Sequence, residues 1–164
     1  MGVGMMPIVG TPEQVAAGME SIWKETGCCG FNLTPTINDG SIRDYQFKSP
    51  QWTPGKNFDD TGAFGPDFVT ADALPPGCEG LLLQTRLNGQ VVQQASISDM
   101  VFPVARLVAI LSQFMTLKPG DVIVTGTPSG VGLARKPPLW MKHGDTVEVE
   151  IERVGLLSNP VRDR

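Results

Sequence analysis

The sequence predicts a mainly β protein with some α-helix, and three observations lead to this class. The chain of 164 residues contains 19 glycines and 14 prolines, a turn-rich composition that favours strands over a helical bundle. Residues 146–152 alternate apolar and polar side chains, the pattern of a strand with one buried face. Asn88-Gly89 separates two strand-like runs and supplies the positive φ angles of a tight hairpin turn. The length suits one ordinary domain with its own core.

The beginning of the chain reads as a strand, a helix and the start of a second strand. Residues 7–10 form a short apolar run, and Thr11-Pro12 places an N-cap before a proline at the first helical position. Apolar residues then recur at helical spacing as far as Trp23, and Gly27 ends the helix. A new extended segment begins at residues 30–33, Gly-Phe-Asn-Leu.

Beyond this region, the pattern predicts an irregular segment followed by strands and one helix. Residues 47–66 are rich in proline and glycine and lack periodicity, which is typical of a loop or lid over a site. The elements predicted after it are strands at 68–70, 81–87 and 90–95, a helix over roughly 99–115, and strands at 122–125 and 146–152. The helix carries an apolar stripe that reaches Met115, and Ser98 or Asp99 is its expected cap.

Charge and composition exclude several classes of protein. Lys and Arg number 13 against 17 Asp and Glu, which gives a net charge of −4 without a basic run, so we expect no nucleic-acid partner. No apolar run approaches the length of a membrane span and no signal peptide begins the chain, so we expect a cytoplasmic protein without a membrane partner. Three cysteines, two of them adjacent, argue against a disulfide framework.

The most informative stretch is residues 38–46, which read Asn-Asp-Gly-Ser-Ile-Arg-Asp-Tyr-Gln, with Gly-Lys-Asn-Phe following at 55–58. It brings a carboxylate, a guanidinium, an amide and an ammonium group close together in the sequence, and such groups hold oxyanions or metal ions. Residues 125–130, Thr-Gly-Thr-Pro-Ser-Gly, form a glycine-rich turn whose successive N–H groups can make an anion nest.

Together these motifs resemble the fumarylacetoacetate hydrolase family, over residues 36–164. The resemblance implies a mixed-sheet β-sandwich or roll, incomplete at its N-terminus. It also implies a metal-dependent enzyme that acts on small 2-oxo or 1,3-dioxo acids through an enolate stabilised by Mg²⁺ or Mn²⁺. The expected reactions are C–C bond cleavage, decarboxylation, hydration or isomerisation in aromatic-compound catabolism, and the expected partners are a 2-oxo acid substrate and a second copy in a homodimer.

The resemblance assigns roles to five residues. Asp39 matches a metal ligand, Arg43 and Lys56 match catalytic residues, and the substrate-binding positions are Arg43, Gln46, Lys56 and Thr127. Each has a plainer alternative: an ion pair with a neighbouring acid for the arginine, ordinary loop residues for the glutamine and the lysine, and a structural turn for the threonine.

Two parts of the family site lack a counterpart in the sequence. The family's Glu-x-Glu pair, expected upstream, is absent, and Glu148-Val149-Glu150 has the right spacing but reads as the solvated face of a strand. His143, the single histidine, reads as a surface turn residue, so no general base is recognisable. The alternative function is therefore a truncated, catalytically impaired fragment or fusion product that lacks the metal-binding glutamates and the base.

Residues 7–35 show a second resemblance, to the closing β/α unit of luciferase-like flavin-dependent monooxygenases, carried by residues 10–16 and 30–33. One such unit cannot build a barrel or a flavin pocket, so no flavin is expected. The chain is thus predicted to divide into a strand-helix segment at 1–35 and a catalytic domain at 36–164.

Overall fold

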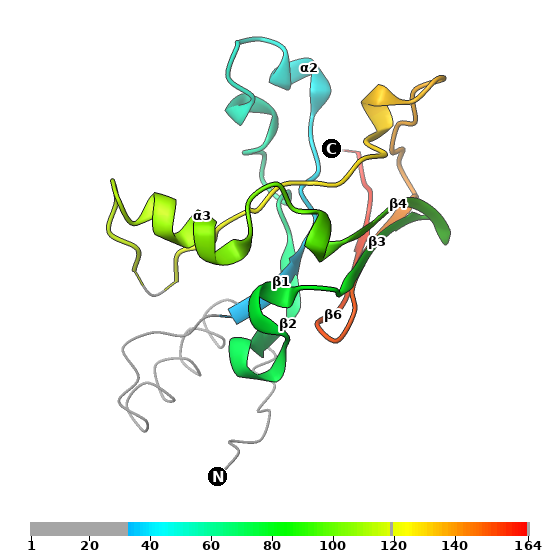
Figure 1. The fold of residues 1–164 in the computed structure, drawn as a ribbon. Helices are drawn as coiled ribbons and strands as arrows, with labels where there is room; N and C mark the ends of the chain where they lie inside the picture. Colours follow the sequence, from blue (N-terminus) through cyan, green and yellow to red (C-terminus); the bar gives the residue numbers. More distant parts are fainter. Residues whose placement is uncertain (1–32, 119, 164) are drawn as a thin grey trace.

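The structure, a computed structural model, describes residues 33–118 and 120–163. The strand predicted at 7–10 and the helix predicted to end at Gly27 lie outside the described residues, as does nearly all of the segment with flavoprotein resemblance. Within the described part, strands predominate and the α-helices are short (Figure 1). The predicted class, mainly β with some α, is confirmed.

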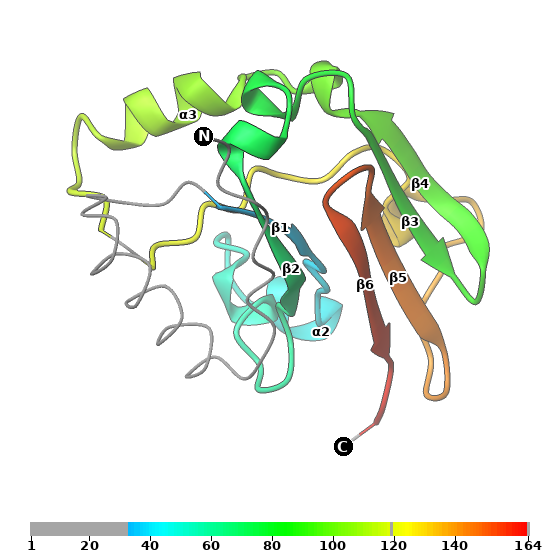
Figure 2. The same ribbon diagram turned by 90° about the horizontal axis from the view of Figure 1, so that it is seen from below.

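The strands form two antiparallel sheets. The first pairs β1 (Leu33–Ile37) with β2 (Phe64–Thr70). The second has four strands in the order β4 (Gln90–Ser96), β3 (Leu82–Leu87), β5 (Thr146–Ile151) and β6 (Gly155–Pro160). The two-stranded sheet lies against the β5–β6 side of the larger one (Figure 2).

The hairpin of β3 and β4 forms as predicted. Asn88 and Gly89 both have positive φ angles, +51° and +78°, which is the geometry of a primed two-residue turn. The turn is also tied to β5, because the N–H of Asn88 donates to the carbonyl of Thr146 at 2.9 Å. This third strand gives the hairpin the support that an isolated two-stranded ribbon lacks.

The core lies on one face of β5. The alternation predicted there is confirmed: Val147, Val149 and Ile151 are buried, while the glutamates between them are half-exposed. Residues from several elements complete the buried cluster, namely Val69, Leu74, Leu81, Ile151 and Val154. Strand β6, which pairs with β5, was not predicted, because a segment reading Gly-Leu-Leu-Ser-Asn-Pro carries more turn formers than strand formers.

The predicted helix over 99–115 is wrong in its extent. Helix α3 runs only from Val104 to Leu111, and residues 97–99 form a separate 3₁₀ turn that Ser96 caps. Pro103 explains the break, because the residue before a proline disfavours the helical conformation. None of the eight residues of α3 is buried, so its apolar stripe faces no packed layer within the described part of the chain.

Two further predictions need correction. Residues 122–125 are not a strand, because no other described strand pairs with them. Residues 47–66 are less irregular than predicted, since they hold a 3₁₀ turn at Thr53–Gly55 and the first residues of β2, which begins at Phe64 rather than 68. A short helix, α2 (Arg43–Gln46), precedes them. No helix among the described residues has the length and apolar character needed to cross a membrane.

Candidate active site

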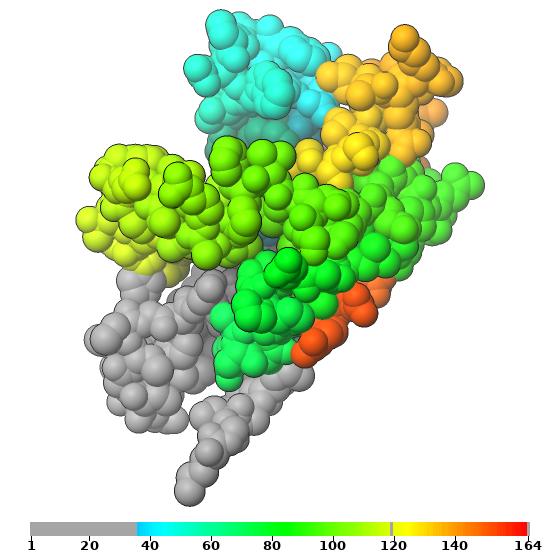
Figure 3. Space-filling model, viewed as in Figure 1, coloured from blue at the N-terminus to red at the C-terminus, as the bar shows by residue number. Residues whose placement is uncertain are grey.

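The candidate site begins with residues 38–58, which we call the α2 loop. It projects from the body of the molecule as a lobe beside residues 130–140 (Figure 3). The loop folds back on itself: the N–H of Ile42 donates to the carbonyl of Gly55 at 2.9 Å. A side chain at 55 would bring its Cβ within 2.7 Å of the Cβ of Gln46, so only glycine allows this approach.

Lys56 and Asp39 meet at the base of the α2 loop. The ammonium Nζ lies 2.8 Å from Oδ1 of the carboxylate and donates to the backbone carbonyl of Asp39 at 3.0 Å. Both side chains are partly exposed, at 28% and 38%. The sequence placed them 17 residues apart, and the fold brings them into direct contact as a charge-assisted pair.

Arg43 and Gln46 form a second pair, one helical turn apart on α2. The guanidinium NH1 donates to Oε1 of Gln46, and the glutamine is 1% exposed beneath Gly55. The arginine therefore bonds a buried amide rather than the neighbouring acid weighed as the alternative. In this arrangement the glutamine acts first as a support for the guanidinium.

Thr127 lies in a turn fixed to strand β4. The side-chain amide Nε2 of Gln93 donates to Oγ1 of Thr127 at 3.0 Å and to the carbonyl of Pro128 at 2.9 Å. Arg135 adds a second tie, because its Nε donates to the carbonyl of Gly130 at 3.0 Å. The turn is thus held by Gln93, which lies 34 residues before Thr127, and by Arg135, which lies five residues after Gly130.

A groove of about 1070 Å³ connects these parts. Its walls are largely apolar and come from β2, β3, α3, β5 and residues 122–124. Asp39 and Thr127 both line it. Lys56 reaches it through Asp39, whereas Arg43 and Gln46 are not among its lining residues. The structure therefore brings the five predicted residues together only in part: one carboxylate–ammonium pair and one hydroxyl share the groove, and the arginine–glutamine pair lies outside it.

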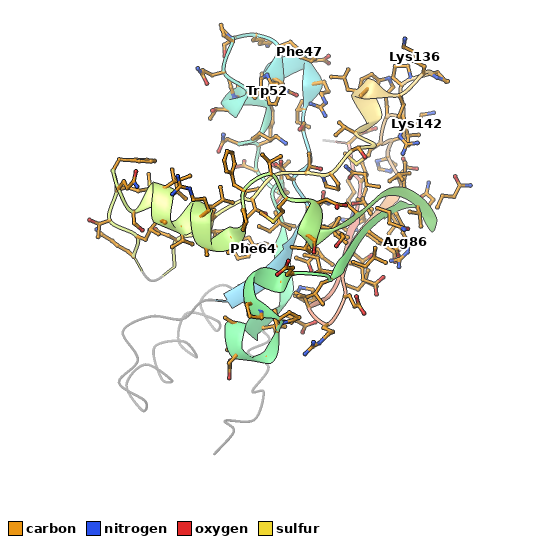
Figure 4. All side chains as sticks on the ribbon, in the orientation of Figure 1. Phe47, Trp52, Phe64, Arg86, Lys136 and Lys142 are labelled. Atoms are coloured by element: carbon orange, nitrogen blue, oxygen red, sulfur yellow. The ribbon has the colours of Figure 1, made fainter. Side chains whose placement is uncertain are left out.

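The glutamates of β5 do not reach the groove. Val149 and Ile151 line it, so the alternating pleat turns Glu148 and Glu150 to the opposite face. There Glu150 pairs with Arg86, which projects from the outer side of the sheet (Figure 4). This confirms the interpretation of a solvated face and excludes them as substitute metal ligands.

The described residues do not make up a metal site by themselves. A hard divalent cation takes about six or more oxygen ligands, several of them from carboxylates, water or substrate. Among the described residues no group of three or more acidic, histidine or cysteine side chains gathers. Asp39 offers one carboxylate, and Lys56 already pairs with it.

Among the residues that the structure describes, two groups have clearly shifted pKa values, and both lie on the larger sheet and its turns, away from the groove. Hydrogen bonds from Asn88 and from the backbone of Lys142 lower the pKa of Asp145, and the bond to Glu150 raises the pKa of Arg86. His143 is exposed and accepts from the backbone N–H of Asp163 at 3.1 Å, which confirms it as a surface turn residue.

Gln93 is the functional candidate that sequence reasoning missed. It belongs to a predicted strand and carries no motif of its own. The available signal was register: Gln93 pairs with Thr85 in the hairpin, and both side chains line the groove, where Leu83 on the same face is apolar. A polar pair at inward-facing strand positions indicates a polar partner inside.

Comparisons with known proteins agree with this fold. The family model for the fumarylacetoacetate (FAA) hydrolase C-terminal region matches residues 34–162. A mitochondrial oxaloacetate tautomerase of Rattus norvegicus is 45% identical over 133 residues, covering 80% of this chain and 41% of that protein. An uncharacterized protein of Archaeoglobus fulgidus is 46% identical over 82% of this chain and 50% of its own length.

Solved structures resemble the fold as well. A fumarylacetoacetate hydrolase from Exiguobacterium antarcticum superimposes with a TM-score of 0.74 at 43% identity, covering 78% of this chain and 46% of that one. A 2-hydroxyhepta-2,4-diene-1,7-dioate isomerase from Mycobacterium marinum gives 0.67 at 44% identity, over 77% and 46%. The chain therefore spans about half the length of these structures, and about 40% of the tautomerase.

Proposed function

The chain belongs to the fumarylacetoacetate hydrolase family, and from this premise we propose that it acts in the isomerisation or hydrolytic cleavage of small 2-oxo or 1,3-dioxo acids. Such reactions pass through an enolate, so the site must stabilise negative charge that develops on an oxygen atom. Relatives named as a tautomerase and as an isomerase support the proton transfer, and a relative named as a hydrolase supports the hydrolytic cleavage.

The observation that carries the proposal is the Asp39–Lys56 pair at the groove that Thr127 also lines. The ammonium group is partly exposed and is held by two oxygen atoms of one residue, so it is positioned without being buried. We assign it the stabilisation of the enolate oxygen, and we assign the hydroxyl of Thr127 the binding of the substrate carboxylate. We assign substrate binding also to Arg43, with the buried Gln46 holding its guanidinium, although neither residue lines the groove.

We further propose that a divalent cation, Mg²⁺ or Mn²⁺, binds at Asp39. Since the described residues supply one carboxylate, the remaining ligands must come from elsewhere: from residues outside the described part, from a partner chain or from the substrate. When bound, such an ion supplies Lewis-acid stabilisation of an oxyanion. Titration calorimetry with each metal tests this assignment, and an absence of binding up to millimolar metal would contradict it.

A homodimer is the assembly that we propose. Its support is the apolar surface left open within the described part: Phe114 is 67% exposed, Val124 54%, and α3 buries none of its residues. Large exposed apolar side chains favour an interface in soluble proteins. Light scattering of the purified chain should give twice the mass of one copy, and a monodisperse monomer would refute the assembly.

The second candidate is a catalytically impaired protein, favoured by the lack of a metal-ligand cluster among the described residues. Tautomerisation of oxaloacetate, followed by the ultraviolet absorbance of its enol with and without Mg²⁺, separates the two. A tautomerisation rate above that in buffer without protein supports the active enzyme. A rate equal to that in buffer supports the catalytically impaired protein.

The same assay tests the role of Lys56. Lys56→Met should lower the rate about a hundredfold, because it removes a donor to the developing oxyanion. Lys136→Met is the matched control: Lys136 lies on the segment after the Thr127 turn, exposed and outside the groove (Figure 4). If both variants kept the same rate, the lysine would have no part in the reaction.

A further inference from the structure

Gln93 makes contacts that fix the orientation of its side-chain amide. Its Nε2 lies 2.9 Å from the carbonyl oxygen of Pro128 and 3.4 Å from that of Ser129. Backbone carbonyls only accept hydrogen bonds, so the group that faces them must be the amide NH₂ and not the amide oxygen. The two carbonyls therefore determine that Gln93 is the hydrogen-bond donor toward this turn.

Because Gln93 is the donor, the hydroxyl of Thr127 must be the acceptor in the hydrogen bond between them. The same NH₂ group lies 3.0 Å from Oγ1 of Thr127, and an NH₂ can only donate. The hydroxyl oxygen therefore accepts from Gln93, and its own proton stays available to donate elsewhere. Thr127 is exposed and lines the groove, so that proton can serve a ligand bound there.

The turn that carries Thr127 is held close to β4. Arg135 bonds the carbonyl of Gly130 and also donates to the carbonyl of Val92, the residue before Gln93. At Gly130 a Cβ would lie 2.5 Å from that same carbonyl of Val92, so the two backbones approach as closely as a glycine permits. The position of the hydroxyl relative to the strand is thus set by several contacts, while its direction as donor is set by Gln93.

We propose that Gln93 is a positioning residue that makes Thr127 a hydrogen-bond donor toward the carboxylate of a small acid in the groove. The inference rests on the proposed function for the nature of the ligand. It goes further in naming the residue that fills one acceptor position of the hydroxyl and leaves its proton free to donate. A carboxylate oxygen in the groove can accept this proton.

Gln93→Met removes the amide and keeps the length of the side chain. Gln94→Met is the matched control, because Gln94 is the next residue on the same strand and its amide oxygen accepts from Gln84 instead. With pyruvate as the probe, in the presence of Mg²⁺, Gln93→Met should weaken binding about fivefold, the factor expected for one net hydrogen bond, and Gln94→Met should leave it unchanged.

A double-mutant cycle separates positioning from a structural role. Thr127→Val removes the hydroxyl and should weaken pyruvate binding by a similar factor. Adding Gln93→Met to Thr127→Val should then cause no further loss, because the glutamine acts through the hydroxyl. If the fold-losses of pyruvate binding in the two single variants multiply in the double variant, the proposal is overturned. It is also overturned if Gln93→Met binds pyruvate as well as the unsubstituted chain does.

Hydrogen exchange gives a readout that needs no ligand. Backbone amides of Thr127, Ser129 and Gly130 should exchange faster in Gln93→Met than in the unsubstituted chain or in Gln94→Met, and equal rates would overturn the role of Gln93 in holding the turn. If the unsubstituted chain fails to bind pyruvate, the proposed function and the carboxylate ligand fail, and the exchange rates still decide whether Gln93 holds Thr127.

Discussion

The four-stranded sheet and the segment 121–127 contain equally apolar sequences but have different structures. In the sheet, β5 lies between β3 and β6, and its valines are buried. In the segment, Val122 and Val124 are 47% and 54% exposed, and no described strand pairs with them. The difference teaches that strand propensity becomes a strand only where a neighbour supplies hydrogen-bond partners and a covering layer.

The largest expected difference between the two regions is in the free energy of unfolding after one side chain in each is truncated. Ile151→Ala should lower the free energy of unfolding by about 2–5 kcal/mol, because Ile151 is 9% exposed within the buried cluster. Val124→Ala should change it by less than about 0.5 kcal/mol, since half of that side chain is already in water. Urea denaturation followed by circular dichroism measures both. Equal losses would mean that the segment is packed as tightly as the sheet.

A smaller effect is expected at the glycines of the Thr127 turn. Gly126 and Gly130 have φ angles of +109° and +99°, so alanine is strained at both. Only at Gly130 would the new Cβ collide, at 2.5 Å from the carbonyl of Val92, while nothing lies within 4 Å at Gly126. Gly130→Ala should therefore destabilise the protein by about 1–3 kcal/mol more than Gly126→Ala. Thermal unfolding of the pair checks the difference, and identical midpoints would show that the turn does not rest on β4.

The smallest effect is expected at the turn that joins the hairpin to β5. Asn88 Nδ2 donates to Oδ1 of Asp145 at 2.9 Å, and the N–H of Lys142 donates to its Oδ2 at 2.7 Å. These bonds lower the pKa of Asp145 in the folded state. The stability that they contribute is present above the pKa of the unfolded chain, about 3.9, and is lost as the pH falls through the lower folded-state pKa.

Asp145→Asn should accordingly lower the urea midpoint at pH 7, and this difference should shrink toward zero in strong acid. The exposed Asp44→Asn is a control that should shift the midpoint little at either pH. A difference for Asp145→Asn that stayed constant across the acid range would show that the carboxylate charge contributes nothing to the turn.

Local signals predicted the parts of the fold that local contacts decide. Asn88-Gly89 predicted the hairpin because its backbone angles suit few other structures. The alternation after Thr146 predicted which face of β5 is buried. The predicted helix was too long at both ends, because Pro103 breaks the chain before α3 and residues 112–115 form hydrogen-bonded turns that do not continue the helix. Strand β6 was missed because its pairing with β5, and not its own composition, makes it a strand.

The candidate site was predictable to a similar degree. The sequence placed Asp39 and Lys56 in one stretch, and the structure brings them together. It gave no indication that Gln46 is buried under Gly55, or that Thr127 depends on Gln93, since both contacts join segments whose approach is decided by tertiary packing. The roles of the five residues toward substrate and metal stay predictions.

Glycine has no Cβ, and at position 55 this has a consequence for random mutagenesis of the chain. Because Cβ at that point would strike both the Cβ of Gln46 and the carbonyl of Ile42, a library randomised at 55 alone should return glycine among its folded clones. The requirement at this position is therefore steric, and it does not depend on the charge or reactivity of a side chain.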